Sequence, residues 1–490
     1  MNLAMMKRNS CLIILFALLN FLAKGQSLTD SIFVLPDTTK PLTIENFYYL
    51  VLAHHPIARQ TELLTDVAKQ EIRLARGNFD PKIEVQYATK NFNNTEYYQV
   101  FDGSIKFPTL FPVDPKIGVE RNEGQYLNPE RFITDAFNYR QFYAGISLPL
   151  GRGLITDERR TALRQAELFK DLTEAEQVKL INKLLLDAAK DYWNWYHAYY
   201  NFRLLQRGVV VAQDIFERTK INAQLGEAAP IDTIQAKITL QQRLIEQQEA
   251  ILDFQNSGIL LSTYLWDSLG NPAALTAELV PVLRRDLLVL SPQELDALTK
   301  QALQNHPELR KLSIRLQQLE NERRLATEFL KPRLDLNYGL LNQPFDPAWN
   351  SNFNIGDNYK FGVDFSMPVF LRKERSKLAL TRLKVSGTEY ERNLTQRQVV
   401  NDINATHNEL VNTAGIMSNQ LSMVQNYERL LQAEILNFEN GESDLFRINI
   451  QQERLIQSQS KLVKLMSQYE KQKALLYWAA GIRNLGFATD

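Results

Sequence analysis

Apolar side chains recur along this 490-residue chain with two different periods, and the change from one to the other occurs twice. In each half a helical period starts at a His-Pro pair and runs to a second proline, where strict two-residue alternation begins. The His-Pro pairs end at Pro56 and Pro307, and the second prolines are Pro81 and Pro332, so both pairs are separated by the same offset. We therefore interpret the chain as two copies of one helix-to-strand unit.

Four segments alternate between apolar and polar residues, and we predict strands at about 82–90, 139–148, 333–341 and 358–368. Each is close to the roughly 9 to 11 residues that cross a bilayer as a tilted strand. The polar faces would line water and the apolar faces would meet lipid. A soluble sheet with one face on a core would show the same alternation. The residues predicted to face the lumen are Glu84, Gln86, Gln141, Asp335, Asn337, Lys360 and Asp364.

A sheet in lipid needs closed edges, because unpaired backbone groups find no water there. Four strands are too few for closure, since single-chain barrels begin at about eight. Several copies of the chain must then combine to complete a barrel. The first strand pair is joined by a long connection, residues 91–137, which we expect on the outer surface, with Phe107 to Pro112 packed over the mouth.

The helical parts are longer than a globular core requires. No proline interrupts the chain from Asp157 to Leu225, and helix-forming residues dominate there. Apolar columns at sevenfold spacing, such as Ile238, Ile245, Leu252 and Ile259, indicate left-handed coiled-coil packing. A glycine turn in each half, at Gly226 and at Gly441, joins two long helices into an antiparallel hairpin. After the second turn, Ser443 or Asp444 can cap the helix that follows.

One stretch of the long helix is crowded with aromatic residues between Tyr192 and Phe202. A ligand cage is conceivable, but we favour a packed girdle where the repeats meet. The five histidines have no metal-site spacing, and the carboxylates form no recognisable catalytic arrangement. We predict no enzyme activity, no cofactor and no metal.

The ends and the charge narrow the class further. Residues 1–25 resemble an export signal, with Lys7 and Arg8 before an apolar run that contains the only cysteine, Cys11. The formal net charge is zero, so nothing favours binding to nucleic acid. After the signal, no apolar run approaches the length of a membrane helix.

At this point the chain resembles the TolC family of outer-membrane efflux proteins. The resemblance rests on Ala302 to Leu309, on the strand exits Ser147 to Leu150 and Ser366 to Val369, on the two glycine turns, and on the ending Leu475 to Gly481. It implies an α+β fold, in which a homotrimer with four strands per chain completes a transmembrane β-barrel of twelve strands. Long antiparallel coiled coils would form an α-helical barrel in the periplasm.

The same resemblance implies partners and a site. The partners would be a periplasmic adaptor (membrane-fusion) protein and an inner-membrane pump of RND, ABC or similar type, besides outer-membrane lipid. The periplasmic tips would contact the adaptor and close the entrance. Members of the family often carry an acidic residue six positions after the second glycine, where this chain has Arg447, so a cation-selective ring of carboxylates is in doubt. The tip residues are Gly226, Glu227, Asp232, Gly441, Glu442, Asp444 and Arg447.

We thus expect a signal peptide (1–25), a first repeat (26–266), a connection (267–290), a second repeat (291–482) and a short tail (483–490). The expected function is the outer-membrane exit duct of a tripartite efflux or type I secretion system. The alternative is a secreted periplasmic coiled-coil protein without a pore. For the tip carboxylates, the alternative to a role at the entrance is that they only cap helices. Such capping is compatible with both expected functions.

Overall fold

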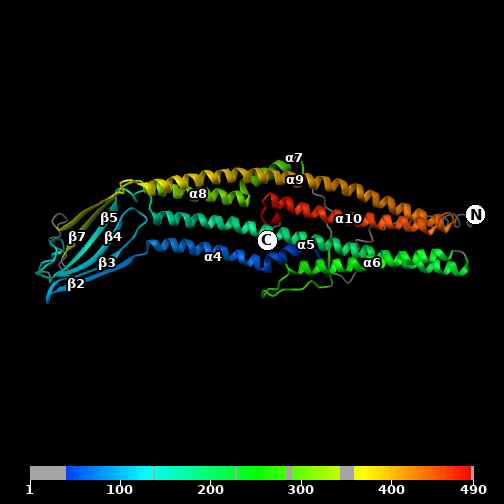
Figure 1. Ribbon diagram of the computed structural model, residues 1–490, viewed down its shortest axis with the longest axis horizontal. Coiled ribbons are helices and arrows are strands. Elements are labelled where there is room, and N and C mark those ends of the chain that lie inside the picture. Colours follow the sequence, from blue (N-terminus) through cyan, green and yellow to red (C-terminus); the bar gives the residue numbers. More distant parts are fainter. Residues whose placement is uncertain are drawn as a thin grey trace, which may run out of the picture. The chain divides into compact units, whose positions relative to one another are not determined.

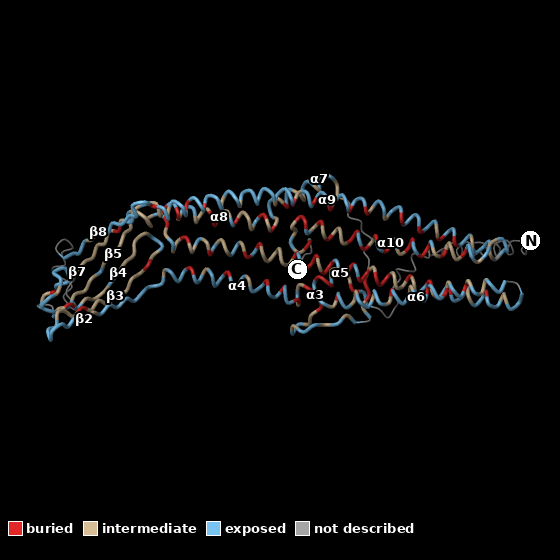
Figure 2. The backbone as a smooth tube through the Cα atoms, in the orientation of Figure 1, coloured by how far each residue is buried: buried red, intermediate tan, exposed pale blue. Residues whose placement is uncertain are grey.

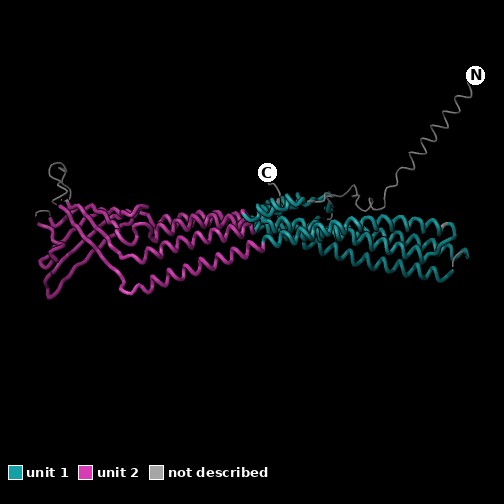
Figure 3. Tube along the Cα trace, turned by 90° about the horizontal axis from the view of Figure 1, so that it is seen from above, with its two compact units in different colours: residues 1–60, 180–303, 399–490 teal, residues 61–179, 304–398 magenta. Residues whose placement is uncertain are grey.

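The structure, a computed structural model, describes residues 40–135, 138–226, 229–276, 278–282, 290–342 and 358–486. The chain divides into two compact units, coloured separately in Figure 3. Unit 1 comprises residues 1–60, 180–303 and 399–490, and unit 2 comprises residues 61–179 and 304–398. The expected export signal and most of the 342–357 connection lie outside the described residues.

Two very long helices, each followed by a shorter one, form the helical hairpins that the sequence predicts (Figure 1). Long runs of good helix formers without proline explain their length. Within the described ranges, none of the helices carries a stretch that is both long and apolar enough to cross a membrane. The helices are α3 (Ile44–His54), α4 (Pro56–Arg76), α5 (Glu158–Leu225), α6 (Pro230–Ser262), α7 (Pro292–Asn305), α8 (Pro307–Glu328), α9 (Arg372–Glu439) and α10 (Leu445–Ala479).

Unit 2 contains an antiparallel sheet of six strands, in the order β2-β3-β4-β5-β7-β8 (Figure 1). Its strands β2, β5, β7 and β8 occupy the four segments whose alternation predicted strands. Its strands are β2 (Lys82–Phe92), β3 (Thr95–Lys106), β4 (Asp114–Glu123), β5 (Arg140–Pro149), β7 (Arg333–Asn342) and β8 (Tyr359–Ser366). A separate parallel pair, β1 (Lys40–Leu42) with β6 (Leu279–Pro281), belongs to unit 1.

The expectation of four strands per chain is therefore wrong, because β3 and β4 lie within the predicted 91–137 connection. Their alternation is obscured in the sequence. Val100 and Phe101 are neighbours, and the polar or small residues Asp102 to Ser104 follow them directly. Pattern alone did not reveal a strand with so few large apolar residues on one face.

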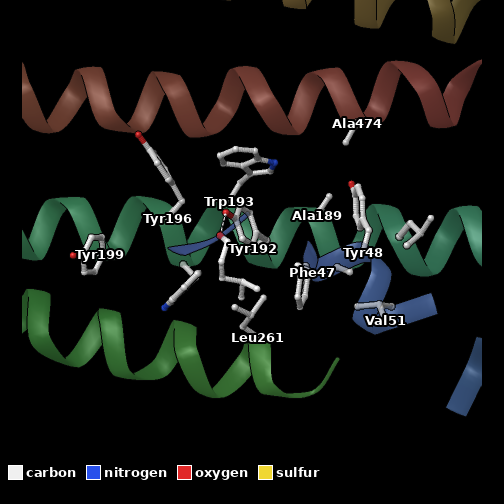
Figure 4. Packing of buried hydrophobic residues seen from close by; sticks show 14 of the residues in the cluster. Phe47, Tyr48, Val51, Ala189, Tyr192, Trp193, Tyr196, Tyr199, Leu261 and Ala474 are labelled. Carbon is white, nitrogen blue, oxygen red and sulfur yellow. Dashed lines mark hydrogen bonds between the residues drawn. The ribbon is translucent and has the colours of Figure 1, made fainter. Parts of the chain in front are cut away.

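The core of unit 1 forms around the aromatic stretch of α5 (Figure 4). Tyr192, Trp195 and Tyr196 are fully buried. The Tyr192 hydroxyl donates to the Leu42 carbonyl at 2.7 Å, so a buried polar group fixes the β1 segment to the helix. The packed girdle is confirmed, and the alternative of a ligand cage is not. The α3 and α6 residues against it include Phe47, Tyr48, Val51 and Leu261.

Both repeats use a histidine to start the helix that follows the His-Pro pair. His55 Nδ1 accepts from the Ile57 N–H at 3.2 Å, and His306 Nδ1 accepts from the Glu308 N–H at 3.3 Å. A side-chain acceptor at this position satisfies one of the unpaired N–H groups of the first turn. The acceptor exists only while Nδ1 carries no proton.

The first of these caps should weaken in acid. Burial lowers the pKa of His55 from its ordinary value of 6.5. Below pH 6.5 the histidine is therefore protonated more readily in the unfolded chain than in the folded one. The stability contribution is therefore complete above pH 6.5 and declines as the pH falls. Hydrogen exchange of the amides at the start of α4, corrected for intrinsic rates, should show faster opening at pH 5.5 than at pH 7.5.

A matched variant separates this effect from the titration of other groups. His55→Asn keeps a side-chain acceptor but has no proton to bind, so the pH dependence of exchange should disappear. His55→Ala should lose the cap at every pH, at a cost of about 1 kcal/mol. An unchanged pH dependence in the asparagine variant would contradict the assignment.

Candidate pore-lining face and helix tips

The strand register places all seven predicted lumen residues on one face of the sheet, which we call the polar face. Directly opposed residues share a face, and side chains alternate along each strand. Through the pairs Glu84–Ser104, Ser104–Gly118 and Gly118–Tyr143 the face runs from β2 to β5, and through Asp335–Asp364 it reaches β8. The predicted members are Glu84, Gln86, Gln141, Asp335, Asn337, Lys360 and Asp364.

Polar side chains on this face bind one another across strands. The Tyr143 hydroxyl of β5 donates to Asp102 of β3 at 2.8 Å, and Lys116 of β4 lies 3.9 Å from the same carboxylate. Gly118 makes room for the tyrosine ring, because a Cβ there would lie 2.5 Å from its Cζ. Near the other edge, Asn337 donates to Asp364 at 2.7 Å. The sequence did not indicate Asp102, Lys116 or Tyr143 as residues of this face. Asp102 and Lys116 lie on strands that the sequence did not reveal, and in the strand of Tyr143 only the apolar residues of the opposite face were considered.

The opposite face is apolar and open to its surroundings, and we call it the apolar face. Figure 2 shows β2 as largely exposed along its length. At the two edges of the sheet Ile83 is 77% exposed and Phe365 is 66% exposed. Exposed apolar area on this scale indicates contact with lipid or with another protein. Its other exposed members include Val85, Tyr87, Ile117, Ile146, Tyr359, Phe361 and Val363.

The connections of the sheet lie at opposite ends. Because α4 leads into β2 and β5 leads into α5, residues 107–113 turn at the end near the helices. Asp114 accepts from the Thr109 N–H at 3.1 Å and lies 3.2 Å from Arg159 in the first turn of α5. The expectation that Phe107 to Pro112 packs over the outer mouth is therefore wrong. Because β3 runs back toward the helices, the segment that joins it to β4 lies at the helix end of the sheet.

The segment between β4 and β5 lies at the far end of the sheet and returns over the polar face. Asn122, which shares that face with Glu120, is buried, and its Nδ2 donates to the Arg131 carbonyl at 3.0 Å. Val100, opposite Asn122 in the register, and Ile133 are also buried. This segment thus covers part of the polar face at the end away from the helices.

The two helix tips use the caps that the glycine turns predicted. Gly226 and Gly441 have φ values of +76° and +79°, in the left-handed region that favours glycine. At the second tip the Gly441 N–H donates to Phe438 and the Glu442 N–H to Asn437. These two bonds satisfy carbonyls at the end of α9 in a Schellman motif.

The tip carboxylates take part in capping. Asp232 accepts from the Ala229 N–H at 3.2 Å, and Asp444 accepts from the Arg447 N–H at 2.9 Å. The Arg447 guanidinium also lies 3.8 Å from Asp444. A positive charge thus accompanies the carboxylate at the second tip. The remaining predicted tip residue, Glu227, lies outside the described residues.

The described part of the chain contains no group of three or more histidine, cysteine, aspartate or glutamate side chains that could hold a metal ion. The chemistry of the polar face and of the tips is that of capping, hydrogen bonding and ion pairing.

Comparisons with a protein-family model and with solved structures both gave matches. The family described as "Outer membrane efflux protein" matches residues 298–482. No curated protein sequence matches the chain significantly.

Solved structures show the same fold over most of the chain. The Campylobacter jejuni CmeC outer membrane channel is 14% identical, with a TM-score of 0.61, and the match covers 89% of this chain and 85% of that one. The outer membrane protein VceC from Vibrio cholerae is 14% identical, with a TM-score of 0.60 and coverages of 89% and 96%. The open state of the Neisseria gonorrhoeae MtrE outer membrane channel is 12% identical, with a TM-score of 0.60 and coverages of 89% and 88%.

Proposed function

We propose that the chain is a TolC-family outer membrane efflux protein and serves as the outer-membrane exit duct of an export system. The sheet provides a water-filled passage through the outer membrane, and the helical hairpins extend that passage into the periplasm. Transport through the duct is passive, and the energy comes from a pump elsewhere. The observation that carries this proposal is the six-stranded sheet with one polar and one exposed apolar face.

The polar face supplies the lumen of this passage. This face offers water and cargo hydrogen-bond donors and acceptors, as well as side chains of both charges. Examples are Glu84, Gln141, Asn337 and Lys360. Many of its charges already have partners within the sheet, such as Asp102 with Lys116. A lining of this kind solvates diverse molecules without holding them, as a conduit requires.

The two tips form the periplasmic entrance in this proposal. Gly226 and Asp232 at one tip, and Gly441, Glu442, Asp444 and Arg447 at the other, would contact the adaptor and bound the opening. Glu227, the next residue after Gly226 in the sequence, belongs to the same proposed set. The nearby ion pair of Asp444 with Arg447 argues against a ring of unpaired carboxylates. Selectivity for cations is therefore not part of the proposal.

A second set of exposed apolar residues supports assembly of several copies. On α6, Ile231, Ile238, Ile245, Leu252 and Ile259 repeat at sevenfold spacing, and all are more than half exposed. The column on α10 that contains Leu455, Leu462, Tyr469 and Leu476 is buried within the chain. A heptad column that the described residues of its own chain leave exposed fits a helix of another copy, such as α9, which exposes Ile416, Met423 and Leu430.

We propose a homotrimer as the working assembly, with a periplasmic adaptor and an inner-membrane pump of RND, ABC or similar type as further partners. The helix tips are the part of the chain that such an adaptor would reach. The alternative, a soluble periplasmic spacer, leaves the exposed apolar face of the sheet without a role.

Fractionation of cells that make the full-length protein tests the proposal. We expect the protein in the outer-membrane fraction, extracted only by detergent, as a particle three times the mass of the mature chain. A soluble periplasmic monomer would overturn both the duct and the assembly. Loss of the gene should also sensitise cells to exported compounds, and a wild-type copy should restore resistance.

A further inference from the structure

The hairpin β3–β4 adds two strands to the wall, and its presence changes the barrel that this chain can build. We propose that three copies form an outer-membrane barrel of eighteen strands, in which β2 of one copy pairs with β8 of the next. This inference rests on the proposed trimeric duct. It differs from the twelve strands that four strands per chain would give.

The added hairpin is an integral part of the sheet. The β2–β3 register runs from Lys82–Lys106 to Phe92–Thr95, and β4 pairs with β5 from Asp114–Ser147 to Arg121–Arg140. In the strand order, β3 and β4 separate β2 from β5. Removing the hairpin from the wall would break both ladders and require a new one between β2 and β5.

Both inserted strands fit a membrane wall. They have 12 and 10 residues, close to the 9 to 11 that span a bilayer. They also maintain the two faces of the sheet, since Ile105 and Ile117 are opposed on the apolar face. The polar face correspondingly carries Asp102 and Lys116. A loop folded on the surface has no need of this pattern.

The edges of the sheet are complementary in direction and chemistry. Within the described strands, β2 and β8 each pair with one neighbour, and in lipid their free backbone groups must find partners. An even number of antiparallel strands makes β8 antiparallel to β2 of a following copy, as in known barrels. The exposed apolar rows at both edges, Ile83 and Val85 on β2 and Phe361, Val363 and Phe365 on β8, would then form one continuous band.

The consequence is a wider passage. Barrel diameter grows roughly linearly with strand number, so eighteen strands give a bore about one and a half times as wide as twelve. Barrels of 16 to 18 strands leave an open aqueous channel. The barrel wall in the membrane then does not limit the size of the cargo, and bulkier molecules can pass through it.

Engineered cysteines test the pairing, since the only natural cysteine, Cys11, lies in the expected export signal. Val85→Cys should be combined in turn with Phe361→Cys, Val363→Cys and Phe365→Cys, which covers several registers. Under oxidation, at least one pair should give covalent dimers and trimers on denaturing gels. Each single-cysteine variant serves as the control and should stay monomeric on those gels.

A second pair places the hairpin inside the wall. Ile117 and Ala144 are register partners, so Ile117→Cys with Ala144→Cys should cross-link within one copy, whereas Val85→Cys with Ala144→Cys should not. The reverse result, or twelve strands seen by imaging of the purified trimer, would overturn the proposal. A soluble protein without trimers would instead refute the proposed duct, so the two failures are distinguishable.

Discussion

Replacement of Gly151 by alanine is expected to destabilise the sheet at the place where the two repeats meet. A Cβ at this position would lie 2.1 Å from the Pro332 carbonyl oxygen. The Leu150 N–H donates to Leu334 at 2.7 Å, and the Arg152 N–H donates to Pro332 at 2.9 Å. The new methyl group would meet backbone rather than a movable side chain, so both hydrogen bonds must give way. We expect a loss of about 3 kcal/mol.

The measurement is the yield and thermal unfolding temperature of the detergent-extracted particle. Gly387→Ala and Gly415→Ala are matched controls, because a Cβ at either glycine of α9 meets nothing within 4 Å. These variants should be stable or slightly more stable, by about 0.5 to 1 kcal/mol, since alanine favours helix. If Gly151→Ala behaved like them, the close approach of the two strand ends would be wrong.

Introducing charge into the exposed α6 column is expected to abolish assembly. Ile245 and Leu252 are 51% and 56% exposed in the single chain, so Ile245→Glu with Leu252→Glu should leave the fold of the hairpin intact. In a trimer each glutamate would be buried against a neighbouring helix. Because each side chain is already half buried in the single chain, each lost aliphatic contact removes about 1 kcal/mol per copy, and burial of an unpaired carboxylate adds to that cost.

Mass determination of the extracted particle and circular dichroism together check this prediction. The double variant should retain its helical signal and lose the trimer, whereas Ile245→Val with Leu252→Met should retain both. A trimer that persists with the two glutamates would show that another surface joins the copies. The column would then need a partner other than a second copy.

The strands that could be predicted are those whose large apolar residues alternate without interruption, such as Leu334, Leu336 and Tyr338 of β7. The inserted hairpin lacks that signal, but it carries another. Asn93 and Asn94 both have positive φ values of 53° and 59°, as a two-residue hairpin turn requires. An Asn-Asn pair directly after the alternating stretch of β2 was therefore the available indication of β3.

Some features of the candidate site could be predicted from the sequence and others could not. Glycine turns predict caps because local backbone geometry determines them, and Gly226, Gly441 and Asp444 follow that rule. The sevenfold column on α6 was recognised from spacing, but spacing alone does not say whether its partner lies in the same chain. Contacts across the polar face, such as Tyr143 with Asp102, depend on strand register, which no local pattern fixes when a strand is missed.

The β3–β4 hairpin enters and leaves the sheet at the same end, between β2 and β5. For that reason it reverses the direction of no other strand and moves no residue from one face to the other. Ancestral chains could therefore have acquired or discarded such a hairpin in a single step, while the helices that follow stayed in place. Gain or loss of such a hairpin changes the number of strands in the sheet, whereas the order and direction of the helices along the chain stay the same.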